Sequence, residues 1–262
     1  GAYGFLRFSF PMFPLAVKLF LIPLLALSVT AIIYGAYVTL MQKDMKRLIA
    51  YSSVSHMGFV TLGIFCLNQN GIEGGILQMI NHGIITGALF LCVGMIYERT
   101  HTRMIEDYGG LFKTVPIFIV IFAIFTLAAI GFPGMNAFIG EFLIISGAFK
   151  ANMVIAAFSI LGVILGASYM VWLYYRVALN EINPNTKAQL TDLDLREIAT
   201  LLPLVILVFL IGLQPEVLLS YMHVSVEHLL ERIHATLPIE NLPVYDSMAS
   251  FAQYFKEIIG WT

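Results

Sequence analysis

Three ionisable side chains stand near the middle of long apolar segments: His56, His82 and Glu141. In hydrocarbon such a group has no water to solvate it, and a charge at the bilayer centre costs about 2.5–3.5 kcal/mol even on lenient insertion scales. Groups of this kind persist mainly where they face a protein interior or a wet cavity and act there. An imidazole can take up and release a proton near neutral pH. The three residues therefore indicate proton or ion handling.

Both histidines lie on polar stripes of otherwise apolar helices. Ser52 stands four residues before His56, and Gln78 and Thr86 stand four residues before and after His82. Residues four apart share a helix face. Such stripes can also be interhelical glue with no transport role, and that alternative stays open. Two histidines on consecutive helices, both near mid-depth, favour the functional interpretation.

Glu141 follows a break in the fourth apolar segment. The run GFPG at residues 131–134 interrupts a segment too long for one straight crossing, and its proline removes a backbone donor. Broken helices at membrane depth line cavities or face other protein, and transporters often place ion sites there. A plain proline kink is the alternative. Glu141, two turns beyond the break and with Asn136 and Ser146 as its nearest polar neighbours in sequence, favours a function.

The composition requires a membrane around these residues. Of the 262 residues, 59% are hydrophobic and 11% are charged, whereas soluble domains are about one quarter charged. Apolar runs of about 20 residues cross a bilayer as helices. The sequence therefore predicts an all-α membrane protein with about six transmembrane helices, one of them broken, at about 14–40, 48–68, 72–97, 115–149, 152–179 and 197–220.

The flanking regions differ from this transmembrane domain of residues 14–222. Residues 1–13 are typical of the end of a preceding helix and an outer loop, and the chain starts with Gly1 rather than Met. We therefore expect the C-terminal part of a longer protein. In the tail, residues 223–262, apolar and charged residues interleave at first, as in an interfacial amphipathic helix.

The loops fall into two sets that differ in their number of Lys and Arg residues. Nine of the 14 Lys and Arg residues fall in the connections at 41–47, 98–114 and about 176–196. Short loops rich in Lys and Arg stay inside. We expect the 41–47, 98–114 and 180–196 connections to be cytoplasmic or on the matrix side, with both chain ends outside.

Several functional classes are disfavoured by the sequence. The net charge of −2 gives no reason to expect nucleic acid as a partner. Cys66 and Cys92 lie inside apolar segments without metal-ligand spacing, and small apolar fillers are the favoured interpretation. We find no catalytic triad, phosphate loop or metal cluster in the sequence.

Three stretches resemble known sequences. Residues 42–58, QKDMKRLIAYSSVSHMG, are similar to the signature of the antiporter-like membrane subunits of respiratory complex I. Residues 97–103, YERTHTR, and the segment from GFPG at 131–134 to GEF at 140–142 are similar to the subunit M branch of that family, which corresponds to mitochondrial subunit 4. The resemblance covers about residues 1–235.

The resemblance implies the second half of an antiporter-like fold of fourteen transmembrane helices. It implies that His56 and His82 lie on a central polar axis that ends at Glu141, with protons passing between the histidines through water and on to Glu141. The implied function is that of a proton-translocating membrane subunit of NADH-quinone oxidoreductase. The family's glutamate and lysines of the first half would precede Gly1, so this segment should not pump alone.

The resemblance also implies where the redox chemistry lies. It implies no cofactor and no metal in this chain, because NADH, FMN, iron–sulfur clusters and quinone would be bound by other subunits. The expected partners are other membrane subunits of complex I, especially neighbouring antiporter-like subunits, and the lipid bilayer. The expected location is a bacterial inner or a mitochondrial inner membrane.

Two other functions stay open at this point. One is a subunit of a multisubunit cation/proton antiporter, a related family that also keeps the glutamate. The other is a passive scaffold whose polar residues only hold helices together.

Overall fold

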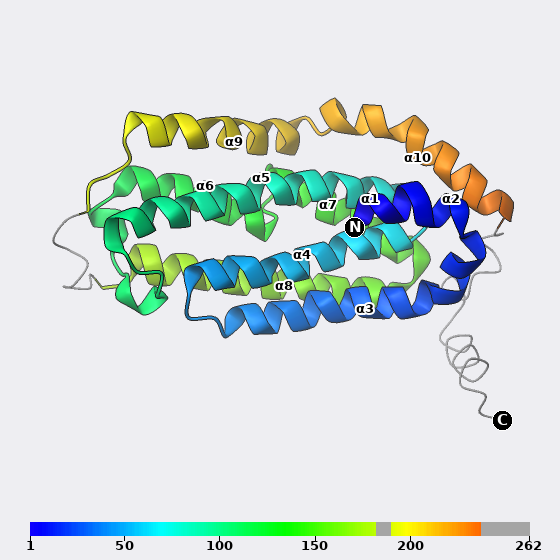
Figure 1. Ribbon diagram of the computed structural model, residues 1–262, viewed down its shortest axis with the longest axis horizontal. Helices are drawn as coiled ribbons and strands as arrows, with labels where there is room; N and C mark the ends of the chain where they lie inside the picture. The colour runs from blue at the N-terminus through cyan, green and yellow to red at the C-terminus, as the bar shows by residue number, and fades with distance from the viewer. Residues whose placement is uncertain (182–189, 237–262) are drawn as a thin grey trace, which may run out of the picture.

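A computed structural model describes residues 1–181 and 190–236, which form a bundle of helices (Figure 1). The expected all-α class is confirmed. Short helical turns come first, namely α1 (Ala2–Gly4), the π-helical turn η1 (Phe5–Ser9) and α2 (Phe10–Met12). The longer helices are α3 (Pro14–Leu40), α4 (Met45–Phe65), α5 (Gln69–Thr100), α6 (Pro116–Ile130), α7 (Asn136–Ala151), α8 (Met153–Tyr174), α9 (Leu195–Leu213) and α10 (Glu216–Thr236).

The described residues contain five helices long and apolar enough to cross a membrane. They are α3, α4, α5, α8 with its π-helical extension to Leu179, and α9. The sixth apolar segment is α6 followed by α7, and it is interrupted after Ile130. Six apolar segments, one of them broken, are what the sequence predicts, so this expectation is confirmed.

Backbone geometry explains the interruption between α6 and α7. Gly131 ends α6 in the left-handed region with φ +74°, and its N–H returns to the carbonyl groups of Ala128 and Leu127. Gly134 follows with φ +92°. Side chains rarely tolerate such φ values, whereas glycine adopts them without steric cost. Pro133 between the two glycines cannot donate a backbone hydrogen bond, so the helix cannot continue through it.

The last apolar segment is shorter than the expected span of 197–220. Helix α9 ends at Leu213, and α10 starts at Glu216, so the amphipathic helix begins before residue 223. Pro215 causes the difference because it lacks an N–H group and keeps Gln214 out of the helical region, at φ −133° and ψ 65°. The rest of the expected tail, residues 237–262, lies outside the described residues.

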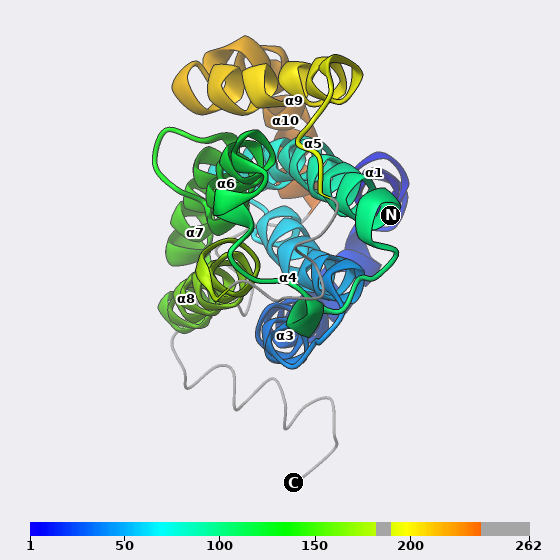
Figure 2. The ribbon, with the colours of Figure 1, turned by 90° about the vertical axis from the view of Figure 1, so that its left-hand side faces the viewer.

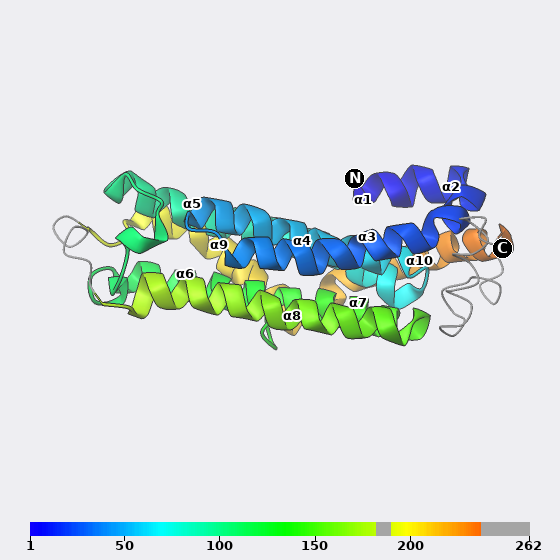
Figure 3. The same ribbon diagram turned by 90° about the horizontal axis from the view of Figure 1, so that it is seen from below.

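Glycines let α4, α5 and α7 approach one another closely. A Cβ atom on Gly63 of α4 would lie 2.5 Å from the carbonyl oxygen of Gly71 of α5, and one on Gly147 of α7 would lie 2.6 Å from the Gly71 nitrogen. Small residues at such crossings are typical of membrane helix bundles. Seen from the end, α4 lies near the middle of the bundle, with α9 and α10 on one side of it and α3 on the other (Figure 2). Helix α8 runs alongside α3 (Figure 3).

The described parts of the three Lys- and Arg-rich connections gather at one end of the bundle. Met45 donates its N–H to the Arg103 carbonyl, which joins the 41–44 and 101–104 loops. Arg99, at the end of α5, contacts the third connection through the carbonyl groups of Thr191 and Asp192. The grouping of these loops is thus observed, while their cytoplasmic or matrix side stays a prediction.

Arg99 fixes α9 to α5. Its Nη1 and Nη2 atoms donate to the two carboxylate oxygens of Glu197 at 2.7 and 2.6 Å, and both side chains are largely buried. A lysine cannot make this forked contact.

We expect Arg99→Lys to lower the stability of the protein by about 2–4 kcal/mol, because it breaks a buried pair and leaves backbone carbonyls without a donor. The measurement is the thermal unfolding midpoint of the detergent-purified protein. Arg196→Lys is the matched control, since Arg196 is exposed and should tolerate the change. Equal midpoints for the two variants would contradict the role assigned to Arg99.

Candidate functional site

The structure brings His56, His82 and Glu141 together inside the bundle. The Nδ1 atom of His56 lies 3.3 Å from Oε1 of Glu141. The ring centres of His56 and His82 are 5.8 Å apart. Both His56 and Glu141 are buried, and His82 is partly exposed. The three residues therefore form one row in which His56, rather than His82, stands next to the carboxylate.

Both ring nitrogens of His56 are occupied. Nε2 is hydrogen-bonded to the hydroxyl group of Tyr169 at 3.2 Å, while Nδ1 faces Glu141. Tyr169 belongs to α8 and is fully buried. If the phenol donates to Nε2, then Nδ1 carries the ring proton of the neutral imidazole and directs it at the carboxylate. This is the arrangement in which a histidine can pass a proton to a carboxylate.

Glu141 is held in place by α5 and by the broken segment. Gln78 of α5 donates from Nε2 to Oε1 of Glu141 at 3.1 Å. The other oxygen, Oε2, lies close to the chain at Gly131, where a Cβ atom would approach it to 2.8 Å. The glycine at the end of α6 thus has two functions, because it permits a positive φ and makes room for the carboxylate.

A second polar layer supports Gln78. Asn81 donates from Nδ2 to the carbonyl oxygen of Asn136 at 2.7 Å and to Oε1 of Gln78 at 3.5 Å. Oδ1 of Asn81 and both side-chain polar atoms of Asn136 are buried without a protein partner. Buried polar atoms usually bind something, and ordered water is the usual partner where protein offers none. The layer beside Glu141 is therefore suited to hold water.

A narrow cavity lies next to the two histidines. It has a volume of about 10 Å³ and is lined by residues of α4, α5, α6 and α7, among them Ser52, His56, Gln78, His82 and Thr86. One water molecule needs roughly 10–15 Å³ of such space. Both imidazoles line this cavity, so a single water there could bridge them.

Some polar neighbours expected from the sequence reach the site and others do not. Thr86 contacts Nδ1 of His82 at 3.1 Å, as their spacing predicts. Gln78 turns to Glu141 rather than to His82. Ser146 faces away from Glu141 and accepts a hydrogen bond from Asn70. Asn136 contributes a backbone carbonyl to the polar layer.

Sequence reasoning missed Tyr169 and the direct bond from Gln78 to Glu141. A phenol inside an apolar span is the only signal for Tyr169, and aromatic residues are common in such spans. Among the described residues, no group of three or more His, Cys, Asp or Glu side chains is placed to hold a metal ion.

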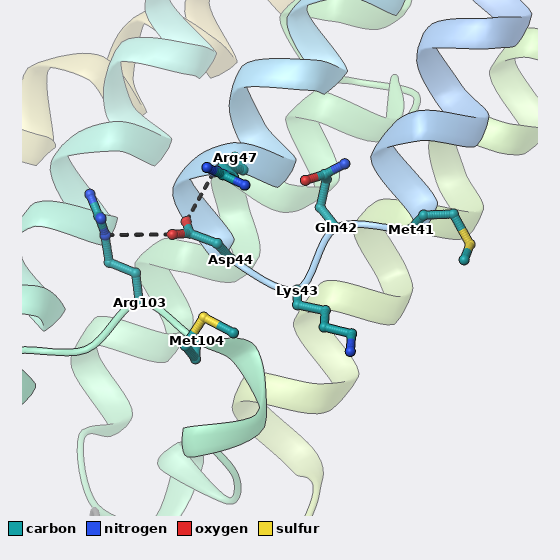
Figure 4. A pocket seen from close by; sticks show the side chains of 7 residues that line it. All are labelled: Met41, Gln42, Lys43, Asp44, Arg47, Arg103 and Met104. Atoms are coloured by element: carbon teal, nitrogen blue, oxygen red, sulfur yellow. Dashed lines mark hydrogen bonds and ion pairs between the residues drawn. The ribbon is translucent and has the colours of Figure 1, made fainter.

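A basic pocket lies far from this row, where the 41–44 and 101–104 loops meet (Figure 4). Asp44 caps α4 by accepting a hydrogen bond from the Arg47 N–H, and its carboxylate pairs with Arg103 at 3.6 Å. Arg103 also lies over the Tyr97 ring. The long stretch similar to antiporter-like subunits begins at this pocket, and here its charged residues join two loops.

Comparison with known proteins shows the family of the chain. Residues 1–166 match the family described as NADH:quinone oxidoreductase/Mrp antiporter, transmembrane. The chain belongs to this family. It is 52% identical over 231 residues to NADH-ubiquinone oxidoreductase chain 4 of Marchantia polymorpha, with 88% of this chain and 47% of that protein covered. It is 48% identical over 237 residues to NADH-quinone oxidoreductase subunit M of Rhodobacter capsulatus, with 90% and 46% covered.

Solved structures show the same fold. A chain of respiratory complex I from Thermus thermophilus with bound NADH matches with a TM-score of 0.85 and 34% identity, covering 89% of this chain and 49% of that chain. A chain of the Mrp complex from Dietzia sp. DQ12-45-1b matches with a TM-score of 0.72 at 18% identity, which shows the fold alone. The chain spans about half the length of the curated relatives it matches. Membership of the antiporter-like family, expected from the sequence motifs, is confirmed.

We expect Gly131→Ala to destabilise the site by about 1–3 kcal/mol, because the new Cβ atom is strained at a positive φ and displaces the Glu141 carboxylate. The measurement is the thermal unfolding midpoint. Gly83→Ala on α5 is the matched control, since nothing lies within 4 Å of a Cβ atom there. A Gly131→Ala midpoint at or above that of the control would contradict the crowding at Glu141.

Proposed function

We propose that this chain is part of a proton-translocating membrane subunit of NADH-quinone oxidoreductase. The observation that carries the proposal is the row of His82, His56 and Glu141 inside the bundle, with His56 placed between the other two. Its relatives of about 50% identity carry the names NADH-ubiquinone oxidoreductase chain 4 and NADH-quinone oxidoreductase subunit M. NADH oxidation and quinone reduction would take place on other subunits and drive proton movement through this one.

The geometry suggests the order of proton transfer. A proton on His82 reaches His56 through water in the cavity between them, because their ring centres are 5.8 Å apart. His56 then passes its Nδ1 proton to Glu141, 3.3 Å away. The incoming proton is taken up at Nε2 before Nδ1 gives up its own, so the ring passes through the imidazolium form and ends neutral. Tyr169 keeps the imidazole oriented, and its hydroxyl oxygen then accepts a hydrogen bond from Nε2. Gln78 stabilises the charged carboxylate, so that a proton can leave again when the neighbouring charge changes.

The same proposal includes partner subunits outside this chain. The expected partners are neighbouring antiporter-like subunits of complex I, whose changes of charge would drive the row. The many large apolar side chains exposed on α3 and α8 offer surface to lipid or to such neighbours. We place the chain in a bacterial or a mitochondrial inner membrane.

A cation/proton antiporter subunit is the second candidate function. The family description covers Mrp antiporters, and the Mrp complex from Dietzia sp. shares the fold. Gene neighbourhood separates the two candidates, since genes for quinone-reductase subunits alongside favour the first and genes for small antiporter subunits favour the second. The identity of 18% to the Mrp chain against about 50% to the oxidoreductase subunits favours the first.

We expect Glu141→Gln, introduced into the full-length subunit of the assembled complex, to slow NADH-driven proton pumping into membrane vesicles by roughly tenfold or more, because the amide cannot carry a proton. The amide keeps the shape of the side chain, so assembly should be normal. Glu227→Gln is the matched control, as Glu227 is exposed on α10.

Unchanged pumping in an assembled Glu141→Gln complex would refute the relay and support a scaffold whose polar residues only join helices. Loss of pumping in the Glu227→Gln control would show that the assay responds to any lost carboxylate.

A further inference from the structure

A second group of proton-carrying side chains lies away from the row, where α10 packs on the first turns of α5. Glu73 of α5 is buried. Its Oε1 atom lies 2.7 Å from Nδ1 of His223 on α10 and also accepts a hydrogen bond from Gln69. The other ring nitrogen of His223, Nε2, lies 3.9 Å from Oε2 of Glu216. One imidazole thus joins two carboxylates from two helices.

Exposure rises in steps along this group. The side chain of Glu73 is 6% exposed, that of His223 is 46% exposed and that of Glu216 is 75% exposed. Each step connects a more buried titratable group to a more exposed one. The group therefore leads from the interior of the bundle to its outer face.

Attachment of α10 does not require these charges. Val226 and Leu230 of α10 already bury apolar surface against Ile72 of α5, and Leu219 packs against Leu77. A buried carboxylate costs free energy unless it is paired, and apolar side chains would hold the helix as well. A buried glutamate next to a half-exposed histidine at this place is better explained by an exchange of protons than by packing.

The group lies on the side of the row that faces away from the basic loops. Glu73 stands five residues before Gln78, which places it about 7.5 Å along the α5 axis from the residue that binds Glu141. That direction leads to the 66–68 connection, which has no Lys or Arg. By the distribution of basic residues, this is the predicted outer side.

We propose that Glu73 and His223, with Glu216 beside the ring, form the station at which protons are exchanged between this subunit and the water at its outer surface. This inference rests on the proposed function, because it assigns the place where translocated protons leave. It concerns protons as the ligand and requires no other cofactor.

One proton passes through the His223 ring in three steps. Nδ1 of the neutral ring takes the proton of the Glu73 carboxyl group, which leaves a carboxylate and an imidazolium. The imidazolium then releases its Nε2 proton to water at the exposed edge of the ring, and the ring is neutral again with its proton on Nδ1. A half-turn of the ring, or exchange with water, then brings an unprotonated nitrogen back towards Glu73. One proton has moved from Glu73 to water, and the cycle closes when a translocated proton reprotonates Glu73.

The electrostatic surroundings favour the imidazolium step. Among the described residues, the charged groups that act on His223 are Glu73 of α5 and Glu216 of α10 itself, and both raise its pKa above the usual value, with the hydrogen bond to Glu73 as the largest cause. Because the pKa is raised in the folded protein, the pairing with Glu73 is fully formed below pH 6.5 and is lost as the pH rises through the raised pKa. A shuttle works best near its own pKa, so it should matter most above pH 6.5.

We expect His223→Gln in the assembled complex to slow NADH-driven proton pumping by roughly tenfold above pH 6.5. The loss should be smaller at lower pH, where the ring stays protonated and releases protons less readily even in the unmodified complex. The amide can still bond to Glu73 but cannot carry a proton. His228→Gln is the matched control, because His228 pairs with Glu231 on α10 and both side chains are exposed. We expect this control to pump like the unmodified complex at every pH.

His223→Lys separates an exchange station from a simple clamp. A lysine keeps the positive charge that pairs with Glu73 but does not release its proton near neutral pH. We expect it to pump as slowly as His223→Gln, whereas a clamp would let it pump normally. Should both variants lose the complex from the membrane, Glu73→Gln decides, because the amide keeps a hydrogen bond to His223 but cannot carry a proton. Slow pumping in that variant supports the station, and normal pumping overturns it.

Failure of this inference is distinguishable from failure of the proposed function. Slow pumping in Glu141→Gln together with normal pumping in His223→Gln would leave the function standing and overturn the exchange station. Normal pumping in Glu141→Gln would overturn the function itself, and the station with it.

Discussion

A carboxylate inside an apolar helix bundle has to be solvated by protein or by water, and the structure around Glu141 follows from that requirement. The groups that solvate it come from different helices, with His56 on α4 and Gln78 on α5, while Glu141 itself is on α7. These three helices must therefore approach closely. Glycines at their crossings allow it, since Cβ atoms on Gly63 and Gly147 would collide with the backbone of α5.

The break between α6 and α7 serves the same requirement. A continuous helix would fill the space next to Oε2 of Glu141 with a side chain, whereas Gly131 leaves the backbone bare there. The end of α9 packs on this break, because a Cβ atom on Gly212 would come within 2.6 Å of the Met135 Cα atom. The Gln214–Pro215 interruption follows directly. Two interrupted segments thus meet close to the carboxylate, where a regular bundle would have had only apolar contacts.

Much of this arrangement could be predicted from the sequence because ionisable side chains are rare in apolar membrane segments. Ionisable residues within apolar runs mark His56, His82 and Glu141 without further information, and glycine and proline mark the break. The family likewise follows from the stretch at 42–58 and is confirmed by its relatives. These signals lie in short stretches of sequence, so they do not depend on how the helices pack against one another.

The partners of the site could not be predicted because they depend on how helices are rotated against one another. Spacing assigns Gln78 to the face of His82, yet it bonds to Glu141 across the interface with α7. Tyr169 contacts His56 from a helix more than a hundred residues later in the chain. The pairing of Glu73 with His223 depends on where α9 ends, and a single proline sets that point.

The central claim is that His56 and Glu141 act as one proton-carrying unit. A double-mutant cycle tests it most directly, with NADH-driven pumping measured for the assembled complex carrying His56→Gln, Glu141→Gln and both changes. Residues that act as a unit give strongly non-additive losses, whereas independent residues give losses that multiply. The account predicts that the double variant pumps no more slowly than the slower single variant. Two losses that multiply in the double variant would contradict it.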